Sequence, residues 1–187
     1  MWLNGVNRMP IMWSQCVDLN GAAVPHVLTN LPPILDFEAS SLSDTSYPIS
    51  AGLLLKGEIH YWVIKPEPDW IDWSLQSQAI HGLTRSFIET QGQPVQQVYT
   101  QMVALLQREP YVYSDNPEWE QMWFSRLGAR SFGFLNVLDL LSPRARPLFP
   151  LFRTTMIEKH GLTAHRADHD VLGIGYAVAE LHSAERD

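Results

Sequence analysis

The sequence has little cysteine, no surplus of basic residues and no long apolar run, and each shortage excludes a class of protein. Cys16 is the only cysteine, so the chain can form neither an internal disulfide nor a zinc site that needs several thiolates. The formal net charge of −7 argues against a protein that coats nucleic acid nonspecifically, because that mode neutralises many phosphates with Lys and Arg. No stretch approaches about eighteen uninterrupted apolar residues. We therefore expect a soluble, cytoplasmic protein with no membrane partner.

Length and patterning predict one domain. With 187 residues, 45% of them hydrophobic, the chain is long enough to bury a full core and too short for two comfortable domains. Residues 1–30 mix Asn, Gly, Pro and scattered Trp without a clear period, which indicates a poorly patterned N-terminal extension. We expect residues 31–187 to form the single domain and to carry the chemistry.

Periodicity predicts alternating strands and helices. Hydrophobic runs bounded by turn residues or prolines predict strands at residues 34–40, 49–55, 59–64, 111–113 and 132–138. Apolar residues at helical spacing predict helices at residues 70–80, 95–106, 117–127, 147–160 and 164–181. Gly161 is expected to end the fourth helix in the left-handed conformation, and Thr163 to cap the fifth. The chain should therefore form an α/β fold, a mixed sheet with antiparallel hairpins first and right-handed crossovers later.

Asp36 and Glu38 are two carboxylates in an otherwise apolar run. Side chains of an extended chain alternate faces with a period of two, so these carboxylates project to the same side. Two acids on a buried strand repel unless a cation lies between them, and hard cations such as Mg²⁺ take oxygen ligands. An isolated Asp-x-Glu is more often a solvated strand end. The metal interpretation therefore depends on residues farther along the chain.

Two later segments carry acids at positions where this architecture brings them near the first strand. Residues 113–120 hold Asp115 and Glu120 where a strand runs into a helix, and His165 and Asp170 lie at the start of the last helix. Positions five apart on a helix lie roughly 140° apart, so His165 is expected in the preceding loop or first turn. Asp170 would then point inward as a ligand, and the imidazole would reach a metal-bound water.

Together these motifs resemble the DnaQ-like 3′-to-5′ exonucleases of the DEDDh class, a branch of the ribonuclease H-like superfamily. The first motif of that family, Asp-x-Glu on the first strand, is matched by Asp36 and Glu38. Its last motif, His-x4-Asp, is matched by His165 and Asp170. Between them, the His-Gly-Leu-Thr of residues 81–84 resembles the family's His-Gly-Ile-Thr element.

The middle motif departs from the family pattern. Family members usually carry Asp one residue after an aromatic in the helix that follows the fourth strand, whereas here Trp119 is followed by Glu120. Glutamate keeps the charge but has one more methylene, so it could ligate a metal with a different reach. Asp115, at the end of the preceding strand, is the other candidate for the third acid. Position favours Glu120, and both candidates stay open.

The resemblance covers about residues 32–182 and implies both a fold and a reaction. The fold is a ribonuclease H-like mixed sheet of five strands in the order 3-2-1-4-5, with three antiparallel strands first and helices on its faces. The reaction is two-metal phosphodiester hydrolysis with Mg²⁺ or Mn²⁺. The implied metal ligands are Asp36, Glu38, Asp170 and either Glu120 or Asp115. Asp36 would bridge both metals, and His165 would be the catalytic general base.

The resemblance also implies a substrate, which is the 3′ end of single-stranded DNA or RNA, or a short oligonucleotide. Phe37 or Leu83 would pack beside the terminal base, and Ser40 or Ser41 would meet its phosphate. The low content of basic residues favours small substrates, because few phosphates need be contacted. A homodimer is compatible with the family.

Other interpretations use the same residues differently. A binding or interaction module could keep the exonuclease fold while Glu120 weakens turnover, and a phosphodiesterase for nucleotide derivatives would use the same acids. A zinc cluster of His160, His165 and His169 is not supported, because no cysteine joins it and Gly161 separates the first histidine from the others.

Overall fold

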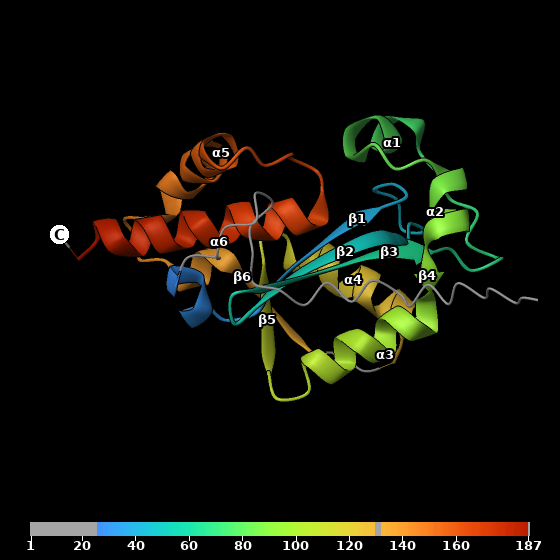
Figure 1. The fold of residues 1–187 in the computed structure, drawn as a ribbon, viewed down its shortest axis with the longest axis horizontal. Helices are drawn as coiled ribbons and strands as arrows, with labels where there is room; N and C mark the ends of the chain where they lie inside the picture. The colour runs from blue at the N-terminus through green and yellow to red at the C-terminus, as the bar shows by residue number, and fades with distance from the viewer. Residues whose placement is uncertain (1–25, 130–131, 187) are drawn as a thin grey trace, which may run out of the picture.

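The structure is a computed structural model that describes residues 26–129 and 132–186. Residues 1–25, most of the predicted N-terminal extension, lie outside the described part of the chain. A six-stranded sheet forms the centre of the described residues, and helices cover both of its faces (Figure 1). No helix within these two ranges is long and apolar enough to cross a membrane.

The sheet has mixed pairing. Its strands are β1 (Ile34–Ala39), β2 (Pro48–Leu55), β3 (Glu58–Lys65), β4 (Gln93–Pro94), β5 (Tyr111–Ser114) and β6 (Gly133–Asn136), in the order β4-β3-β2-β1-β5-β6. β1 and β3 each pair antiparallel with β2, whereas β5 runs parallel to β1 and to β6. The five longer strands therefore confirm the predicted order 3-2-1-4-5. The prediction lacks β4, because two residues are too few to show a periodicity.

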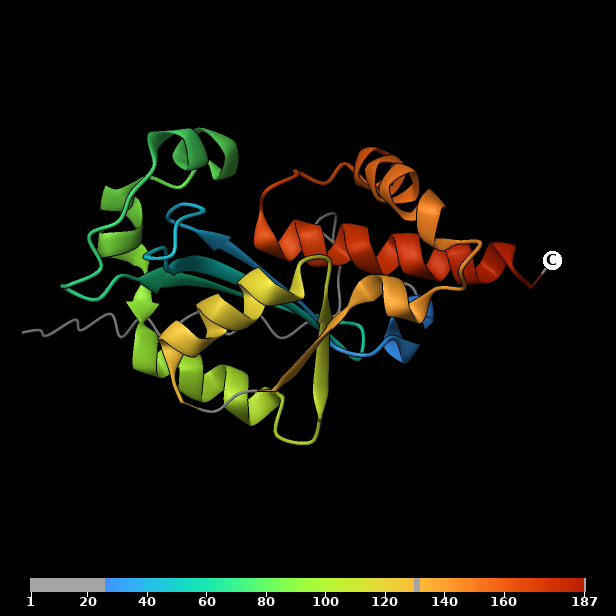
Figure 2. The same ribbon diagram turned by 180° about the vertical axis from the view of Figure 1, so that it is seen from behind.

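Helices lie on both sides of the sheet. They are α1 (Leu75–His81), α2 (Arg85–Gln91), α3 (Val95–Leu105), α4 (Pro117–Leu127), α5 (Phe149–Lys159) and α6 (Ala167–Ala184). Short 3₁₀ turns occupy His26–Asn30, Val137–Leu140 and Arg146–Leu148. α5 and α6 lie over one face and α3 and α4 over the other, as both views show (Figure 1 and Figure 2). α1 and α2 lie at one end of the sheet, towards the start of α6.

β1 contributes to two apolar cores through its alternating side chains. Ile34 packs in the core between the sheet and α5 and α6. Leu35 and Phe37 pack in the opposite core, with α3 and α4. Because successive side chains of a strand point to opposite faces, Asp36 and Glu38 lie on the α6 side. The two predicted acids therefore project towards α6 from the middle of the sheet.

α6 is almost entirely buried between the sheet and α5. A Cβ on Gly175 would lie 2.7 Å from Leu54 Cδ2 of β2, and a Cβ on Gly173 would lie 2.9 Å from Ile157 Cγ1 of α5. These glycines let both neighbours approach the helix closely. This close packing holds α6, whose first turn carries Asp170, against the sheet and α5.

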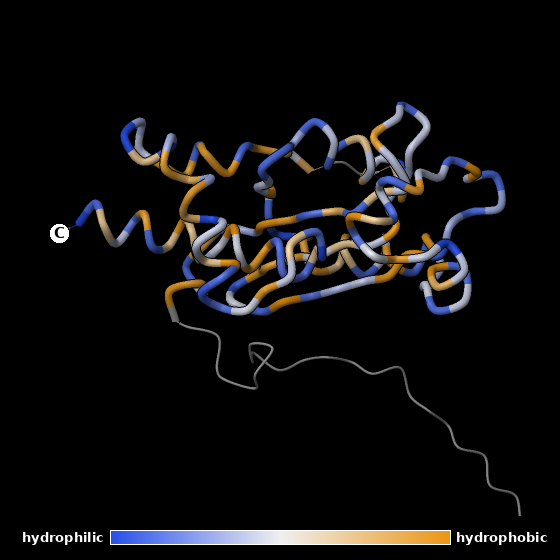
Figure 3. The backbone as a smooth tube through the Cα atoms, turned by 90° about the horizontal axis from the view of Figure 1, so that it is seen from above, coloured by the Kyte–Doolittle hydropathy of each residue, from blue (hydrophilic) through white to orange (hydrophobic). Residues whose placement is uncertain are grey.

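Hydrophobic residues recur along the inner segments of the fold, and hydrophilic residues recur along the outer loops (Figure 3).

Two element boundaries differ from the prediction because polar side chains cap the backbone. The helix predicted at residues 70–80 begins after Ser74, whose Oγ accepts a hydrogen bond from the backbone N–H three residues on. The strand predicted at residues 132–138 ends at Asn136, whose side chain starts a 3₁₀ turn by accepting a hydrogen bond from the backbone N–H two residues on.

The predicted helices do not include α2. Apolar periodicity does not reveal this helix, because Ile88 is its one buried side chain.

The start of α6 also differs from the prediction. Thr163 does not cap the helix, because α6 begins at Ala167 and Arg166 holds the N-cap position. The backbone N–H of Thr163 instead donates to His169 Nδ1 at 2.7 Å. His165 lies in the turn before the helix, with φ 59°. Gly161 has φ 62°, which confirms the left-handed conformation predicted after α5. The turn leaves His165 outside the helix, next to its first residues.

Candidate active site

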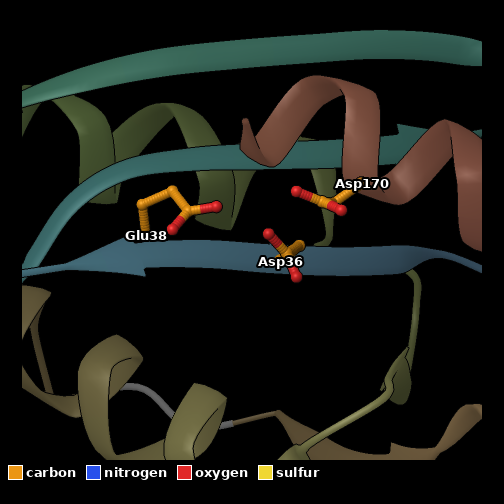
Figure 4. A group of neighbouring side chains, drawn as sticks. All are labelled: Asp36, Glu38 and Asp170. Atoms are coloured by element: carbon orange, nitrogen blue, oxygen red, sulfur yellow. The ribbon is translucent and has the colours of Figure 1, made fainter. Parts of the chain in front are cut away.

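Three carboxylates from two distant segments meet on the α6 side of the sheet. Asp36 and Glu38 project from β1, and Asp170 projects from the first turn of α6 (Figure 4). One oxygen of each lies within 4.8 Å of the others. Asp170 and Asp36 are 2% and 8% exposed, so their charges are largely removed from water. Such a group of oxygens suits a hard divalent cation.

Close packing at Gly52 brings Asp170 to the two acids on β1. Gly52 of β2 pairs in register with Asp36, and a Cβ on it would lie 2.1 Å from the Ala167 carbonyl oxygen. The start of α6 therefore rests on the backbone of β2 at a place where a side chain would collide. Asp170 lies about one turn farther along the helix, so the glycine sets its distance from β1.

Glu120 is a fourth carboxylate at this place, and it is buried. It lies in the first turn of α4, is 3% exposed and accepts a hydrogen bond from the backbone of Phe37. Its Oε2 is buried with no hydrogen-bond partner among the described residues. Burial, followed by repulsion from Glu120, raises the pKa of Asp36 well above its usual value. Burial likewise raises the pKa of Glu120. A bound cation would stabilise the ionised form of both acids.

The pKa values of Glu38 and Asp170 are also raised by burial. Burial, followed by repulsion from Asp170, raises the pKa of Glu38 to about 8. Burial also raises the pKa of Asp170, and the positive charge of Arg153 opposes that shift. Near neutral pH the metal-free cluster therefore holds protons that a cation would displace.

Asp115, the other candidate for the third acid, is engaged by an arginine. Arg153 of α5 contacts Asp115 Oδ2 through Nη1 at 2.6 Å and Asp170 Oδ1 through Nη2 at 2.7 Å. The guanidinium therefore links the end of β5 to the start of α6. Sequence reasoning missed Arg153, because no motif marks it and its place depends on how α5 packs against α6.

A cavity of about 290 Å³ lies beside the acids, on the side of α1 and α2. Glu38 and His165 both line it, so the predicted base and one predicted ligand share the same space. Leu83, expected beside a terminal base, lines it as well. The other lining residues are Ser50, Tyr61, Val63, His81, Phe87 and Arg166. The cavity therefore offers a reacting group access to Glu38 and His165.

Other residues expected at the substrate lie away from this cavity. Phe37 packs with α3 and α4, because it alternates along β1 with the two acids. Ser40 is fully buried and its hydroxyl donates to Asp72 at 2.7 Å, as does the hydroxyl of Ser41. These serines tie the end of β1 to the segment before α1. Alternation along β1 is the sequence signal that could have placed Phe37 correctly.

Comparison with solved structures identifies the fold. A zinc-bound complex of E. coli exonuclease I with single-stranded DNA matches with a TM-score of 0.59 at 14% identity, over 84% of this chain and 41% of that one. The chain has the ribonuclease H-like exonuclease fold. A full-length 3′-exonuclease matches with a TM-score of 0.53 at 15% identity, over 82% of this chain and 81% of that one. Neither a protein-family model nor a curated protein matches the sequence.

The exonuclease fold recurs in a second exonuclease I, from Methylocaldum szegediense. It matches with a TM-score of 0.58 at 16% identity, over 79% of this chain and 39% of that one. The chain therefore spans well under half the length of the exonuclease I structures it matches. Within this exonuclease fold, the meeting of Asp36, Glu38 and Asp170 defines the candidate site.

Proposed function

We propose that this chain is a metal-dependent 3′-to-5′ exonuclease of the DEDDh type that acts on single-stranded DNA or RNA or on short oligonucleotides. The observation that carries the proposal is the meeting of Asp36, Glu38 and Asp170 oxygens within 4.8 Å on an exonuclease fold. E. coli exonuclease I forms a complex with a dA16 oligonucleotide, and a 3′-exonuclease recognises the 3′ end of a histone mRNA stem-loop. The first precedent supports a DNA oligonucleotide as the substrate, and the second supports the 3′ end of an RNA.

The donor set fits divalent cations. Asp36, Glu38 and Asp170 offer carboxylate oxygens, and the unpartnered Oε2 of Glu120 lies buried beside them. Held by these residues, two cations such as Mg²⁺ or Mn²⁺ would supply a water of lowered pKa and stabilise the charge on the leaving 3′ oxygen. Asp36, Glu38 and Asp170 would hold the cations, with Glu120 as the proposed further acid.

His165 is the proposed general base. It lines the same cavity as Glu38 and lies in the turn that precedes α6 and Asp170. An imidazole accepts and releases protons near neutral pH, which suits removal of a proton from the attacking water. Because His165 is exposed in a turn rather than held in the helix, its side chain can orient towards a bound phosphate.

Glu120 is the proposed third acid. Its carboxylate is the largest source of repulsion on Asp36, and one of its oxygens has no hydrogen-bond partner among the described residues. The carboxylate of Asp115 is instead paired with Arg153 at 2.6 Å. The longer glutamate side chain thus takes the place of the aspartate that the family usually carries.

The proposal is tested with 5′-fluorescent single-stranded DNA and RNA, incubated with the protein in Mn²⁺ or Mg²⁺. We expect stepwise shortening from the 3′ end that EDTA abolishes and that Asp36→Asn slows by at least about 1,000-fold. Glu118→Gln is the matched control, because Glu118 is an exposed acid of α4 and its loss should leave the rate unchanged. Absence of cleavage by the folded protein in either metal would refute the exonuclease and favour a binding module.

A further inference from the structure

Arg153 is the cation that forms ion pairs within the acid cluster of the described residues. The cluster comprises the carboxylates that repel one another around β1, namely Asp36, Glu38, Asp115, Glu120 and Asp170. Five carboxylates beside one guanidinium carry an excess of negative charge in a place with little water. Such an arrangement is unfavourable unless cations or protons compensate it.

The guanidinium holds acids from two different elements. Nη1 lies 2.6 Å from Asp115, just after β5, and Nη2 lies 2.7 Å from Asp170 in α6. The Arg153 and Asp115 side chains are 26% and 28% exposed, whereas that of Asp170 is 3% exposed. The contact with Asp170 is therefore the more dehydrated one. Because each nitrogen takes a separate carboxylate, one side chain fixes the separation of the two segments.

Asp170 is fixed through both of its oxygens without any metal. Oδ1 accepts from Arg153, and Oδ2 accepts from the Arg166 backbone N–H at 2.9 Å. The same guanidinium places a positive charge in direct contact with a proposed metal ligand, which opposes the binding of a cation. Arg153 therefore has two opposite effects on the site.

We propose that Arg153 is a positioning residue and internal counter-cation, which keeps the acids assembled in the metal-free protein and weakens the binding of divalent metal. The inference rests on the proposed function, because it takes Asp170 as a metal ligand. Arg153 belongs to none of the motifs that contain the acids and His165. In this arrangement Asp115 anchors the guanidinium of Arg153.

The test measures stability and metal affinity rather than hydrolysis. Arg153→Met removes the charge and keeps an unbranched apolar stem. In EDTA we expect its unfolding midpoint to fall by roughly 5 °C or more. In titration calorimetry we expect it to bind Mn²⁺ at least about threefold more tightly than the wild type. Arg144→Met is the matched control and should change neither quantity, because Arg144 is exposed.

A double variant keeps the test informative if Arg153→Met does not fold without metal. Adding Asp115→Asn to Arg153→Met returns the charge of the cluster to that of the wild type, and should recover part of the stability lost in EDTA. A double variant no more stable than the single one would overturn the inference.

The inference and the proposed function fail in distinguishable ways. If Arg153→Met has the same stability and Mn²⁺ affinity as the wild type, the proposed role of Arg153 is wrong. The proposed metal site is still supported in that case, provided that the wild type binds Mn²⁺. A folded wild-type protein that binds no Mn²⁺ would overturn the proposed function and, with it, this inference.

Discussion

Gly52 lies opposite Asp36 in the β1–β2 ladder, and the start of α6 rests on that glycine. The position of Asp170 relative to β1 thus depends on a glycine, which has no side chain, at this position of β2. The contact is with backbone atoms of α6, so a rotation of side chains cannot relieve a collision there. Gly52 has no catalytic or ligand group, yet it determines whether the three carboxylates meet.

Gly52→Ala is expected to separate the carboxylates. The added Cβ would lie 2.1 Å from the Ala167 carbonyl oxygen, so the helix start must move away from β2. We expect the free energy of unfolding to fall by about 1–3 kcal/mol and Mn²⁺ affinity to fall by at least about tenfold. Chemical denaturation and titration calorimetry measure the two quantities. Wild-type affinity in a folded Gly52→Ala would show that the spacing does not depend on this contact.

Glu120→Gln and Asp115→Asn distinguish the two candidates for the third acid. Glu120→Gln should slow hydrolysis by at least about 100-fold, because it removes a charged oxygen beside Asp36. It should also stabilise the metal-free protein by about 1 kcal/mol, since a buried repulsion is relieved. Asp115→Asn should slow hydrolysis less. The rates come from the oligonucleotide assay, and the opposite order of the two variants would assign the third acid to Asp115.

The metal-free protein should lose stability as the pH rises from about 4.5 to about 8. The pKa of Glu38 is about 8 in the folded state against an ordinary value of 4.5, so the folded state binds more protons across this window. The free energy of unfolding then decreases with pH. The raised pKa values of Asp36 and Glu120 act in the same direction.

Thermal unfolding in EDTA measures this dependence. Between about pH 5.5 and about pH 8 we expect the midpoint to fall by at least about 5 °C. Glu38→Gln should flatten the dependence, because it removes one of the titrating groups. A midpoint that rises over this range would contradict the crowding of buried carboxylates that motivates the metal site.

His165→Gln should separate catalysis from metal binding. Loss of a general base lowers rates by roughly 100- to 10,000-fold. Mn²⁺ affinity should stay within about twofold of the wild type, since His165 lies in the turn outside the acid cluster. The oligonucleotide assay and calorimetry provide both values. A parallel loss of affinity and rate would identify His165 as a ligand instead.

The sequence predicts β1 and the shared face of its two acids, because alternation along a strand is a local pattern. Their interpretation as metal ligands depended on residues farther along the chain. The prediction that Phe37 packs beside a terminal base did not apply this alternation, which places Phe37 on the opposite face with α3 and α4. Asp170 and His165 were assigned through their resemblance to the family's His-x4-Asp motif and the helix that follows it. Strand alternation and motif spacing are both local patterns, which a single sequence contains.

Other features of the site depend on packing between distant elements. Arg153 reaches Asp115 and Asp170 only because α5 lies against α6. Gly52 matters only because the start of α6 approaches β2 at that position. α6 begins later than predicted, with Arg166 rather than Thr163 at its N-cap position, where the helix start packs against Gly52 of β2. Local sequence patterns contain none of these relationships.

The claim that the acids bind divalent metal is tested most directly by anomalous diffraction from crystals of the protein grown with saturating Mn²⁺. We predict an anomalous peak within about 2.5 Å of carboxylate oxygens of Asp36, Glu38 and Asp170. The peak should vanish in crystals of Asp36→Asn. Well-ordered carboxylates without any peak between them would contradict the metal centre and the exonuclease built on it.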